Sequence, residues 1–209
     1  PRSGIRQASM PALSGRPVLT ADIRNFIPDR QITGSKASKF FLPEDFFGVS
    51  AAKMAVEDAE PSVEADDLVR GGLFVASGKE EVRADLISDG VRACMEDGKV
   101  SQRLLGLEGL QHFHPLSLLR VMPNTCLYGI SSLLGFRGPN LNIVASGAAG
   151  AQAVGEAFRA IQVGECTLAL AGATESKIDP VNFAAFEAAG LLSQRIHEPE
   201  GAMRPFDLS

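Results

Sequence analysis

Residues 138–150 have the sequence GPNLNIVASGAAG. The apolar run at residues 141–145 predicts a buried strand, and the alanine-rich segment 148–163 predicts the helix that follows it. Gly147 then stands at the corner between strand and helix. A residue at such a corner lies beside the free backbone N–H groups of the helix, where a thiol would be held largely as its reactive thiolate. Glycine offers no nucleophile at this position.

Strands and helices alternate along the chain. Strands are predicted at residues 72–78, 141–145 and 167–171, and helices at residues 46–59, 79–98, 125–135, 148–163 and 181–189. The first forty or so residues contain several prolines among polar residues and predict loops with short extended pieces. This alternation predicts an α/β fold with a parallel or mixed sheet covered by helices.

The helix predicted at residues 148–163 contains both large apolar residues and small residues. Val154, Phe158 and Ile161 recur at steps of three and four, which predicts that this face packs against the core. Small residues such as Gly150 and Gly155 permit close approach of another backbone. The pattern is typical of a buried central helix.

Composition limits the classes of partner. The 209 residues are 45% hydrophobic and 22% charged, and their formal net charge is −5, which argues against nucleic acid because phosphate binding requires clustered Lys and Arg. No run of 18 or more apolar residues occurs, so we expect no membrane insertion. The first residues contain no apolar core of a signal peptide, and we expect a cytosolic (cytoplasmic) location.

The cysteines and histidines indicate neither a disulfide framework nor a metal site. Cys94, Cys126 and Cys166 show no Cys-x-x-Cys spacing, so free thiols in a reducing compartment are expected, with Cys166 in the core. His112 and His114 lie two residues apart and cannot share a helix face. No metal and no cofactor are predicted.

Two other interpretations of the corner are weaker. Ser146 resembles a catalytic serine only in part, because the nucleophile elbow is Gly-x-Ser-x-Gly and residues 144–148 read VASGA. Anion binding at the start of the helix would require a Gly-Lys-Ser/Thr motif or spaced glycines, which do not accompany residues 146–150. Gly147 can also be an ordinary turn glycine or an engineered replacement. Its neighbours Ala145 and Ala149 are also small, which favours natural sequence divergence over a single engineered change.

Several motifs occur in the order and spacing seen in β-ketoacyl synthases of fatty-acid and polyketide synthesis. They are Ser3-Gly4-Ile5-Arg6, Met122-Pro123-Asn124, Arg137-Gly138-Pro139-Asn140, the corner with Gly150, Ala171-Gly172-Ala173-Thr174-Glu175 and Arg204-Pro205-Phe206-Asp207. The sequence therefore resembles the amino-terminal half of this family along nearly its whole length. The family's corner is approximately Thr-Ala-Cys-Ala-x-Gly, which aligns Gly147 with the nucleophile and Ser146 with the residue before it.

The resemblance implies a thiolase-like fold, in which two similar halves pack as five alternating layers of helices and sheets. Residues 1–209 then form a partial ketosynthase amino-terminal domain, without the family's first strand and without the carboxy-terminal half that carries two histidines and a lysine. Because that first strand is central in its sheet, we expect unpaired backbone groups that another chain would complete. The alternative is that these residues are a portion of a longer protein.

The resemblance also implies a chemistry. In the family the cysteine accepts an acyl group from acyl carrier protein, and decarboxylation of a malonyl unit supplies the carbanion that attacks the thioester. Gly147 marks the missing nucleophile, and Ser146, Ala148 and Gly150 would line the substrate and oxyanion corner. The protein is then a non-condensing ketosynthase-like subunit similar to a polyketide chain-length factor, although those relatives usually carry glutamine at the corner. The alternatives are a β-ketoacyl synthase inactivated by the change and a purely structural dimerisation module.

Partners follow from the same resemblance. We expect acyl carrier protein and an identical or homologous ketosynthase subunit. In the family the strand at residues 141–145 pairs with its counterpart across a two-fold axis, which makes Leu141 and Ile143 candidate interface residues. The segment Met122-Pro123-Asn124 would lie near the same interface, with Cys126 beside it.

Overall fold

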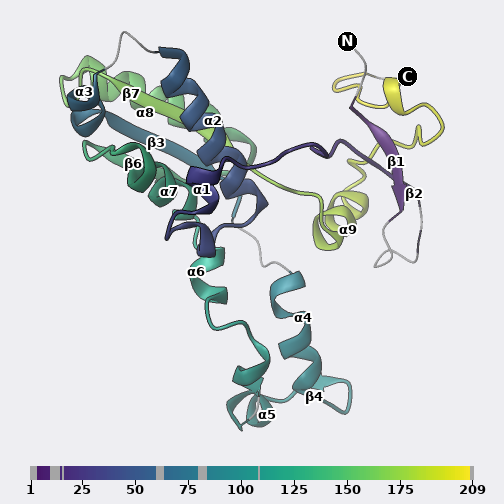
Figure 1. Ribbon diagram of the computed structural model, residues 1–209. Helices are drawn as coiled ribbons and strands as arrows, with labels where there is room; N and C mark the ends of the chain where they lie inside the picture. The colour runs from purple at the N-terminus through teal and green to yellow at the C-terminus, as the bar shows by residue number, and fades with distance from the viewer. Residues whose placement is uncertain are drawn as a thin grey trace. The chain divides into compact units, whose positions relative to one another are not determined.

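The computed structural model describes residues 4–9, 15, 17–59, 64–79, 84–107 and 109–207. The chain divides into two units, which are considered separately (Figure 1). The larger consists of Pro28–Ser176, and the smaller combines Pro1–Ile27 with Lys177–Ser209.

A three-stranded parallel sheet forms the centre of the larger unit. Its strands are β3 (Gly72–Ser77), β6 (Asn140–Ile143) and β7 (Ala169–Thr174), in the order β6-β3-β7. Phe74 of β3 lies opposite Leu141 on one side and Ala171 on the other. All six residues of β3 are buried, as expected for a strand with a neighbour on each side.

In the described part of the chain, the centre of the sheet does not contain the unpaired backbone groups that were predicted from the sequence. β3 and β7 are hydrogen-bonded to each other along their whole length, from Gly72 opposite Ala169 to Ser77 opposite Thr174. Among the described residues, the unpaired edges are therefore the outer sides of β6 and β7.

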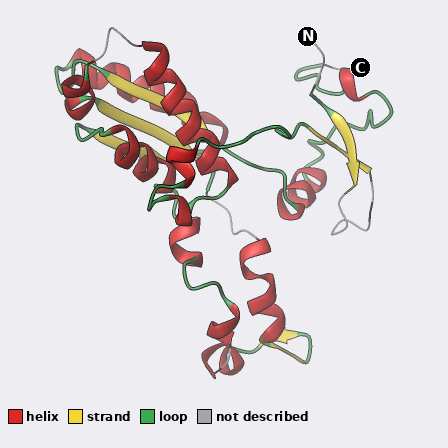
Figure 2. Cartoon of the chain, in the orientation of Figure 1, coloured by secondary structure: helices red, strands yellow, loops and turns green. Residues whose placement is uncertain are grey.

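Helices cover both faces of this sheet, as Figure 2 shows. The helices α2 (Pro43–Ala59) and α7 (Thr125–Leu134) lie on one face, and α8 (Ala149–Gln162) lies on the other. Side chains alternate along β3, so that Leu73 and Val75 join the core under α2 and α7, whereas Phe74 and Ala76 join the core under α8. The result is a helix–sheet–helix arrangement that confirms the predicted α/β class.

The face that α8 turns to the sheet is not the one predicted. Its buried residues are Ala149, Ala153, Ala157 and Ala160. The predicted face is exposed, with 58% exposure at Val154, 66% at Phe158 and 45% at Ile161. Alanines allow the helix backbone to lie close to the sheet, so the bulkier apolar side chains point away from it.

The predicted buried strand at residues 141–145 is also wrong in its burial. β6 is an edge strand with a neighbour only on the β3 side, and Leu141 is 42% exposed. An apolar run alone does not distinguish a central strand from an edge strand.

The predicted helix at residues 79–98 ends earlier than expected, and its residues 80–83 lie outside the described part of the chain. The helix α4 covers Ala84–Ala93, and an antiparallel pair follows, β4 (Met95–Glu96) with β5 (Lys99–Val100). Asp97 and Gly98 connect these strands with φ values of 50° and 75°. The Asp-Gly pair is a strong hairpin signal that the helical pattern obscured.

Short elements connect the main ones. In the larger unit they are α1 (Arg30–Thr33), η2 (Ser38–Phe40), α3 (Ala65–Arg70), α5 (Gln102–Leu107), η3 (Gly109–His112), α6 (Ser117–Val121) and η4 (Ser146–Ala148). The predicted helix at residues 125–135 is confirmed as α7, which ends at Leu134 and is capped by Gly135 with φ 83°.

The described residues of the smaller unit form an antiparallel strand pair, an α-helix and a short 3-10 turn. β1 (Arg6–Ser9) pairs with β2 (Pro17–Thr20), which agrees with the short extended pieces expected there. The helix α9 (Pro180–Ala188) begins after Asp179, whose side chain accepts hydrogen bonds from the N–H groups of Val181 and Asn182. The turn η5 (Pro199–Gly201) follows, and a cavity of about 900 Å³ lies between β2, α9 and the segment after α9. Among the described residues of both units, no helix has the length and apolar character needed to cross a bilayer.

Candidate functional site

Gly147 lies between the end of β6 and the start of α8. β6 ends at Ile143, the short 3-10 turn η4 spans Ser146–Ala148, and α8 begins at Ala149. The structure therefore brings the candidate residues Ser146, Gly147 and Ala148 into a single turn at the carboxyl end of a parallel strand. Ligands of α/β proteins commonly bind at this edge of the sheet.

The backbone of this turn is left-handed at Ser146. Ser146 has a φ of 46°, and Gly147 is not among the glycines with positive φ. A Cβ atom built on Gly147 would meet no other atom within 4 Å. Both the backbone and the space at this position therefore accept a residue with a side chain.

The turn uses N–H groups that an anion would otherwise bind. The N–H of Ala148 donates to the carbonyl oxygen of Ala145 at 3.1 Å, and the N–H of Ala149 donates to that of Ser146. The expectation of free N–H groups at the corner is therefore wrong for these two residues, because a 3-10 turn precedes the helix.

Gly150 has a packing role that the structure makes visible. A Cβ atom on Gly150 would lie 3.2 Å from Cβ of Ala173 in β7. Glycine thus lets the first turn of α8 approach the sheet closely. Its assignment to an oxyanion corner remains a prediction.

The candidate interface residues occupy the larger unit. Leu141 is exposed on the edge strand β6, whereas Ile143 packs partly against the core under α8. Met122 is 39% exposed, and the Pro123 carbonyl accepts a hydrogen bond from Ser77 Oγ at 2.8 Å. Asn124 is exposed just before α7.

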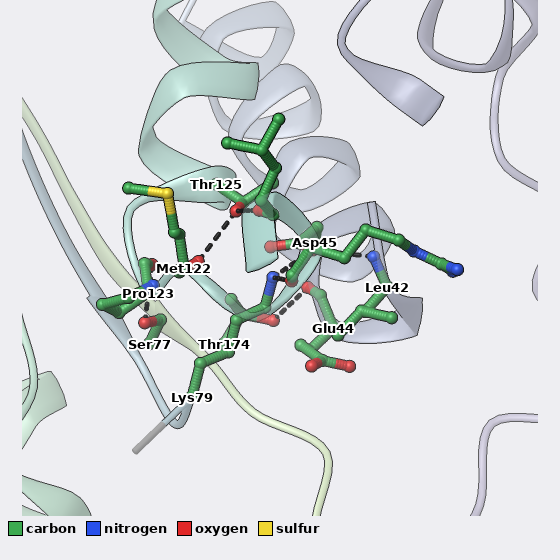
Figure 3. A network of polar contacts seen from close by, with 11 residues as sticks. Leu42, Glu44, Asp45, Ser77, Lys79, Met122, Pro123, Thr125 and Thr174 are labelled. Carbon is green, nitrogen blue, oxygen red and sulfur yellow. Dashed lines mark hydrogen bonds and ion pairs between the residues drawn. The ribbon is translucent and has the colours of Figure 1, made fainter. Parts of the chain in front are cut away.

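A buried polar network, which was not predicted from the sequence, lies beside this segment (Figure 3). Lys79 Nζ is 2.5 Å from Asp45 Oδ2, with side-chain exposures of 4% and 0%. Burial raises the pKa of Asp45, an effect that the Lys79 charge and hydrogen bond oppose. Thr174 Oγ1 donates to the Glu44 carbonyl at 2.5 Å and ties the end of β7 to the start of α2.

Cys126 packs in the core behind this network. It is 0% exposed, so its side chain does not lie on the surface of the larger unit, and its place beside a subunit interface stays a prediction. Burial raises the pKa of its thiol to about 12, with the charge of Asp45 as the next cause. Such a thiol is almost entirely protonated at neutral pH and cannot serve as a nucleophile.

The fold is shared with ketosynthases of known structure. A β-ketoacyl synthase from Burkholderia phymatum STM815 superposes with a TM-score of 0.72 and 24% identity, over 99% of this chain and 48% of that one. The ishigamide ketosynthase/chain length factor superposes with a TM-score of 0.58 and 15% identity, over 96% of this chain and 49% of that one. These similarities establish the thiolase-like ketosynthase fold.

The sequence comparisons establish the family. The family model of the β-ketoacyl synthase amino-terminal domain matches residues 19–209. The mitochondrial 3-oxoacyl-[acyl-carrier-protein] synthase of Arabidopsis thaliana is 32% identical over 163 residues, which are 77% of this chain and 32% of that protein. The chain belongs to the β-ketoacyl synthase family, and it matches the amino-terminal half of the family fold.

A bacterial relative gives the same result. The 3-oxoacyl-[acyl-carrier-protein] synthase 2 of Vibrio cholerae is 31% identical over 163 residues, which are 77% of this chain and 36% of that protein. The matched residues thus cover about a third of the length of these two curated relatives.

Proposed function

We propose that this chain belongs to a ketosynthase-like subunit of fatty-acid or polyketide chain assembly that does not condense by itself. The proposal depends mainly on Gly147, which stands at the strand–helix corner where the family resemblance expects the acyl-accepting cysteine. Covalent capture of an acyl group requires a nucleophile. Glycine has no side chain to supply one.

The other thiols of the chain do not replace the missing one. Cys94 and Cys126 are 0% exposed and Cys166 is 6% exposed, and all three are free. A thiol must be accessible and at least partly ionised to accept an acyl group. Free, buried thiols are also typical of a reducing compartment, which supports the cytosolic location included in this proposal.

The proposed partners are acyl carrier protein and an identical or homologous ketosynthase subunit. Similar architecture occurs in a structure of a type II polyketide-synthase acyl-carrier protein in complex with its ketosynthase, at a TM-score of 0.62 and 23% identity. In this chain the outer side of β6 is an unpaired strand edge among the described residues, and Leu141 on it is exposed. Such edges pair readily with a second chain.

The dimer has its own test. Leu141→Lys in the full-length protein is expected to weaken subunit association by at least about tenfold, because a charge would be buried in the interface. Met54→Lys is the matched control, since Met54 is 67% exposed on α2. Sedimentation equilibrium of both variants measures the effect. Equal dimerisation of the two variants would contradict the proposal that β6 lies in the interface.

The lack of covalent capture can be tested directly. Full-length protein is mixed with acyl carrier protein carrying a radiolabelled acyl group, and the intact protein is analysed by mass spectrometry. We expect no covalent adduct, and a thioester or ester on the chain would overturn the assignment of Gly147. The Gly147→Cys variant is the positive control for an otherwise competent site.

An assay of malonyl decarboxylation distinguishes an inactivated synthase from a structural scaffold. Stabilisation of developing charge does not require the nucleophile, so a ketosynthase lacking only its cysteine can still release carbon dioxide from malonyl-loaded carrier protein. The open space at Gly147 favours a subunit that shapes the acyl tunnel. Release of carbon dioxide would favour an inactivated synthase, and its lack together with dimerisation would favour a scaffold.

A further inference from the structure

Residues 119–123, which cover the carboxyl end of α6 and the connection to α7 and are called the α6–α7 segment below, are held from inside the protein by side-chain donors. The acceptors are the carbonyl oxygens of Leu119, Arg120, Met122 and Pro123. Thr125 Oγ1 contacts the Leu119 carbonyl at 3.2 Å and the Met122 carbonyl at 2.7 Å. Lys79 Nζ donates to the Arg120 carbonyl at 3.0 Å, and Ser77 Oγ donates to the Pro123 carbonyl at 2.8 Å. The single hydroxyl hydrogen of Thr125 is shared between two of these carbonyls, and the Met122 contact is the shorter one. Together the contacts hold the carbonyls inward and limit how the segment can move.

Lys79 is the charged donor of this set and depends on Asp45. Its Nζ lies 2.5 Å from Asp45 Oδ2, and the same oxygen accepts a hydrogen bond from the N–H of Leu42 at 2.7 Å. Two buried charges are tolerated only when they are paired and hydrogen-bonded. The pair thus joins the start of α2, the end of β3 and the α6–α7 segment, as Figure 3 shows.

The outer side of the same segment is exposed to solvent. Met122 is 39% exposed and Asn124 is exposed, although the carbonyls of Met122 and Pro123 are bound inside. We infer that Lys79, held in place by Asp45, is a positioning residue that fixes the Met122–Asn124 surface for binding of a second ketosynthase subunit. The identity of the partner rests on the proposed function, whereas the positioning role does not.

A positioning role for Lys79 predicts a result that a purely structural role does not. Replacing a buried ion pair by apolar residues of similar size often preserves stability. Lys79→Met combined with Asp45→Leu is therefore expected to fold, yet it leaves the Arg120 carbonyl without its donor. The double variant also leaves the N–H of Leu42 without its Asp45 acceptor, so we expect stability to be restored in part, whereas the position of the α6–α7 segment would not be restored.

Hydrogen exchange in the full-length protein measures this distinction. The reporter amides are Thr125, which donates to Met122, and Tyr128, which donates to Asn124. The double variant is expected to exchange these amides at least about tenfold faster, a larger change than at the amides of β3 and α8. Lys79→Met leaves Asp45 buried without its partner and is expected to speed the exchange of all these amides. Lys53→Met is the matched control, because Lys53 pairs with Asp29 at 2.7 Å on the surface.

Partner binding gives the second measurement. We expect subunit association to weaken by at least about fivefold in the double variant and to stay unchanged in Lys53→Met. Wild-type exchange rates in the double variant would overturn the positioning role, and faster exchange with unchanged association would overturn its link to the partner. If Lys79→Met alone does not fold, the double variant decides. If the wild-type protein binds no second subunit, the proposed interface fails, while exchange still decides the positioning role.

Discussion

Ser146 takes the left-handed conformation at the corner between β6 and α8, and its neighbour Gly147 does not. The φ of Ser146 is 46°, whereas Gly147 is in a turn that any residue can adopt and has open space around its Cα. A glycine is usually required where φ is positive or where atoms approach closely. Neither reason applies to Gly147, so neither the backbone conformation nor close packing requires a glycine there.

Gly147→Cys is therefore expected to fold with little change in stability, within about 0.5 kcal/mol of the wild type. The new thiol would be the accessible one, since Cys94, Cys126 and Cys166 are at most 6% exposed. Iodoacetamide at neutral pH should add one group to the folded variant and none to the folded wild type. Intact mass gives the count, and unfolding in guanidinium should make all cysteines of both proteins reactive.

Substitutions of Ser146 should separate backbone conformation from side-chain loss. Ser146→Val is expected to reduce the free energy of unfolding by about 1–2 kcal/mol, because a β-branched residue is strongly disfavoured at positive φ. Ser146→Gly should be neutral or stabilising by up to about 1 kcal/mol. Urea unfolding measures both, and equal destabilisation by the two substitutions would contradict the left-handed assignment.

Gly150 and Gly155 provide a comparison within α8. Gly155 has no atom within 4 Å of a built Cβ, and Gly155→Ala is expected to stabilise the protein by about 0.5–1 kcal/mol through helix propensity. At Gly150 a Cβ would lie 3.2 Å from Ala173, so Gly150→Val should destabilise by about 1–3 kcal/mol. Thermal or urea unfolding of the two variants tests the contrast. A stable Gly150→Val protein would show that α8 packs less closely on β7.

Cys126 should make stability depend on alkaline pH. Its folded pKa is about 12 and its ordinary value is 9.0, so the unfolded chain loses the thiol proton first as pH rises. The stabilisation is fully present below about pH 9 and declines by about 1.4 kcal/mol per pH unit toward pH 12. Cys126→Ala should be less stable at pH 8 because of its cavity, but it should lack this decline.

Urea unfolding at pH 8 and pH 10.5 provides the measurement for Cys126. The stability difference between wild type and Cys126→Ala should shrink by about 2 kcal/mol over this range. A constant difference would show that Cys126 ionises as easily in the folded protein as in the unfolded chain.

Local sequence signals predicted many elements correctly. α7 and α9 were predicted to within a residue or two, because a glycine follows the last turn of each helix. The Asp97-Gly98 hairpin was missed because the helical periodicity of the preceding residues was extended across it. Elements whose ends depend on residues adjacent in the sequence can therefore be predicted from the sequence.

The polar network shows the limit of such prediction. Lys79 and Asp45 are separated by 34 positions, and Thr174 binds the Glu44 carbonyl across 130 positions. A lysine just beyond a buried strand was the only local signal that a charge would be enclosed there. The partner of a buried charge depends on how the helices pack, which no local pattern specifies.

The sequence alone determined that residue 147 has no side chain and so no nucleophilic group. The strand-to-helix corner was predictable too, since its parts are adjacent in the chain. Only the tertiary structure decided that Ser146 bears the positive φ, that the alanine face of α8 meets the sheet and that Leu141 lies on an exposed edge. These properties depend on contacts between residues far apart in sequence, and burial is a property of the packed molecule and not of the local pattern.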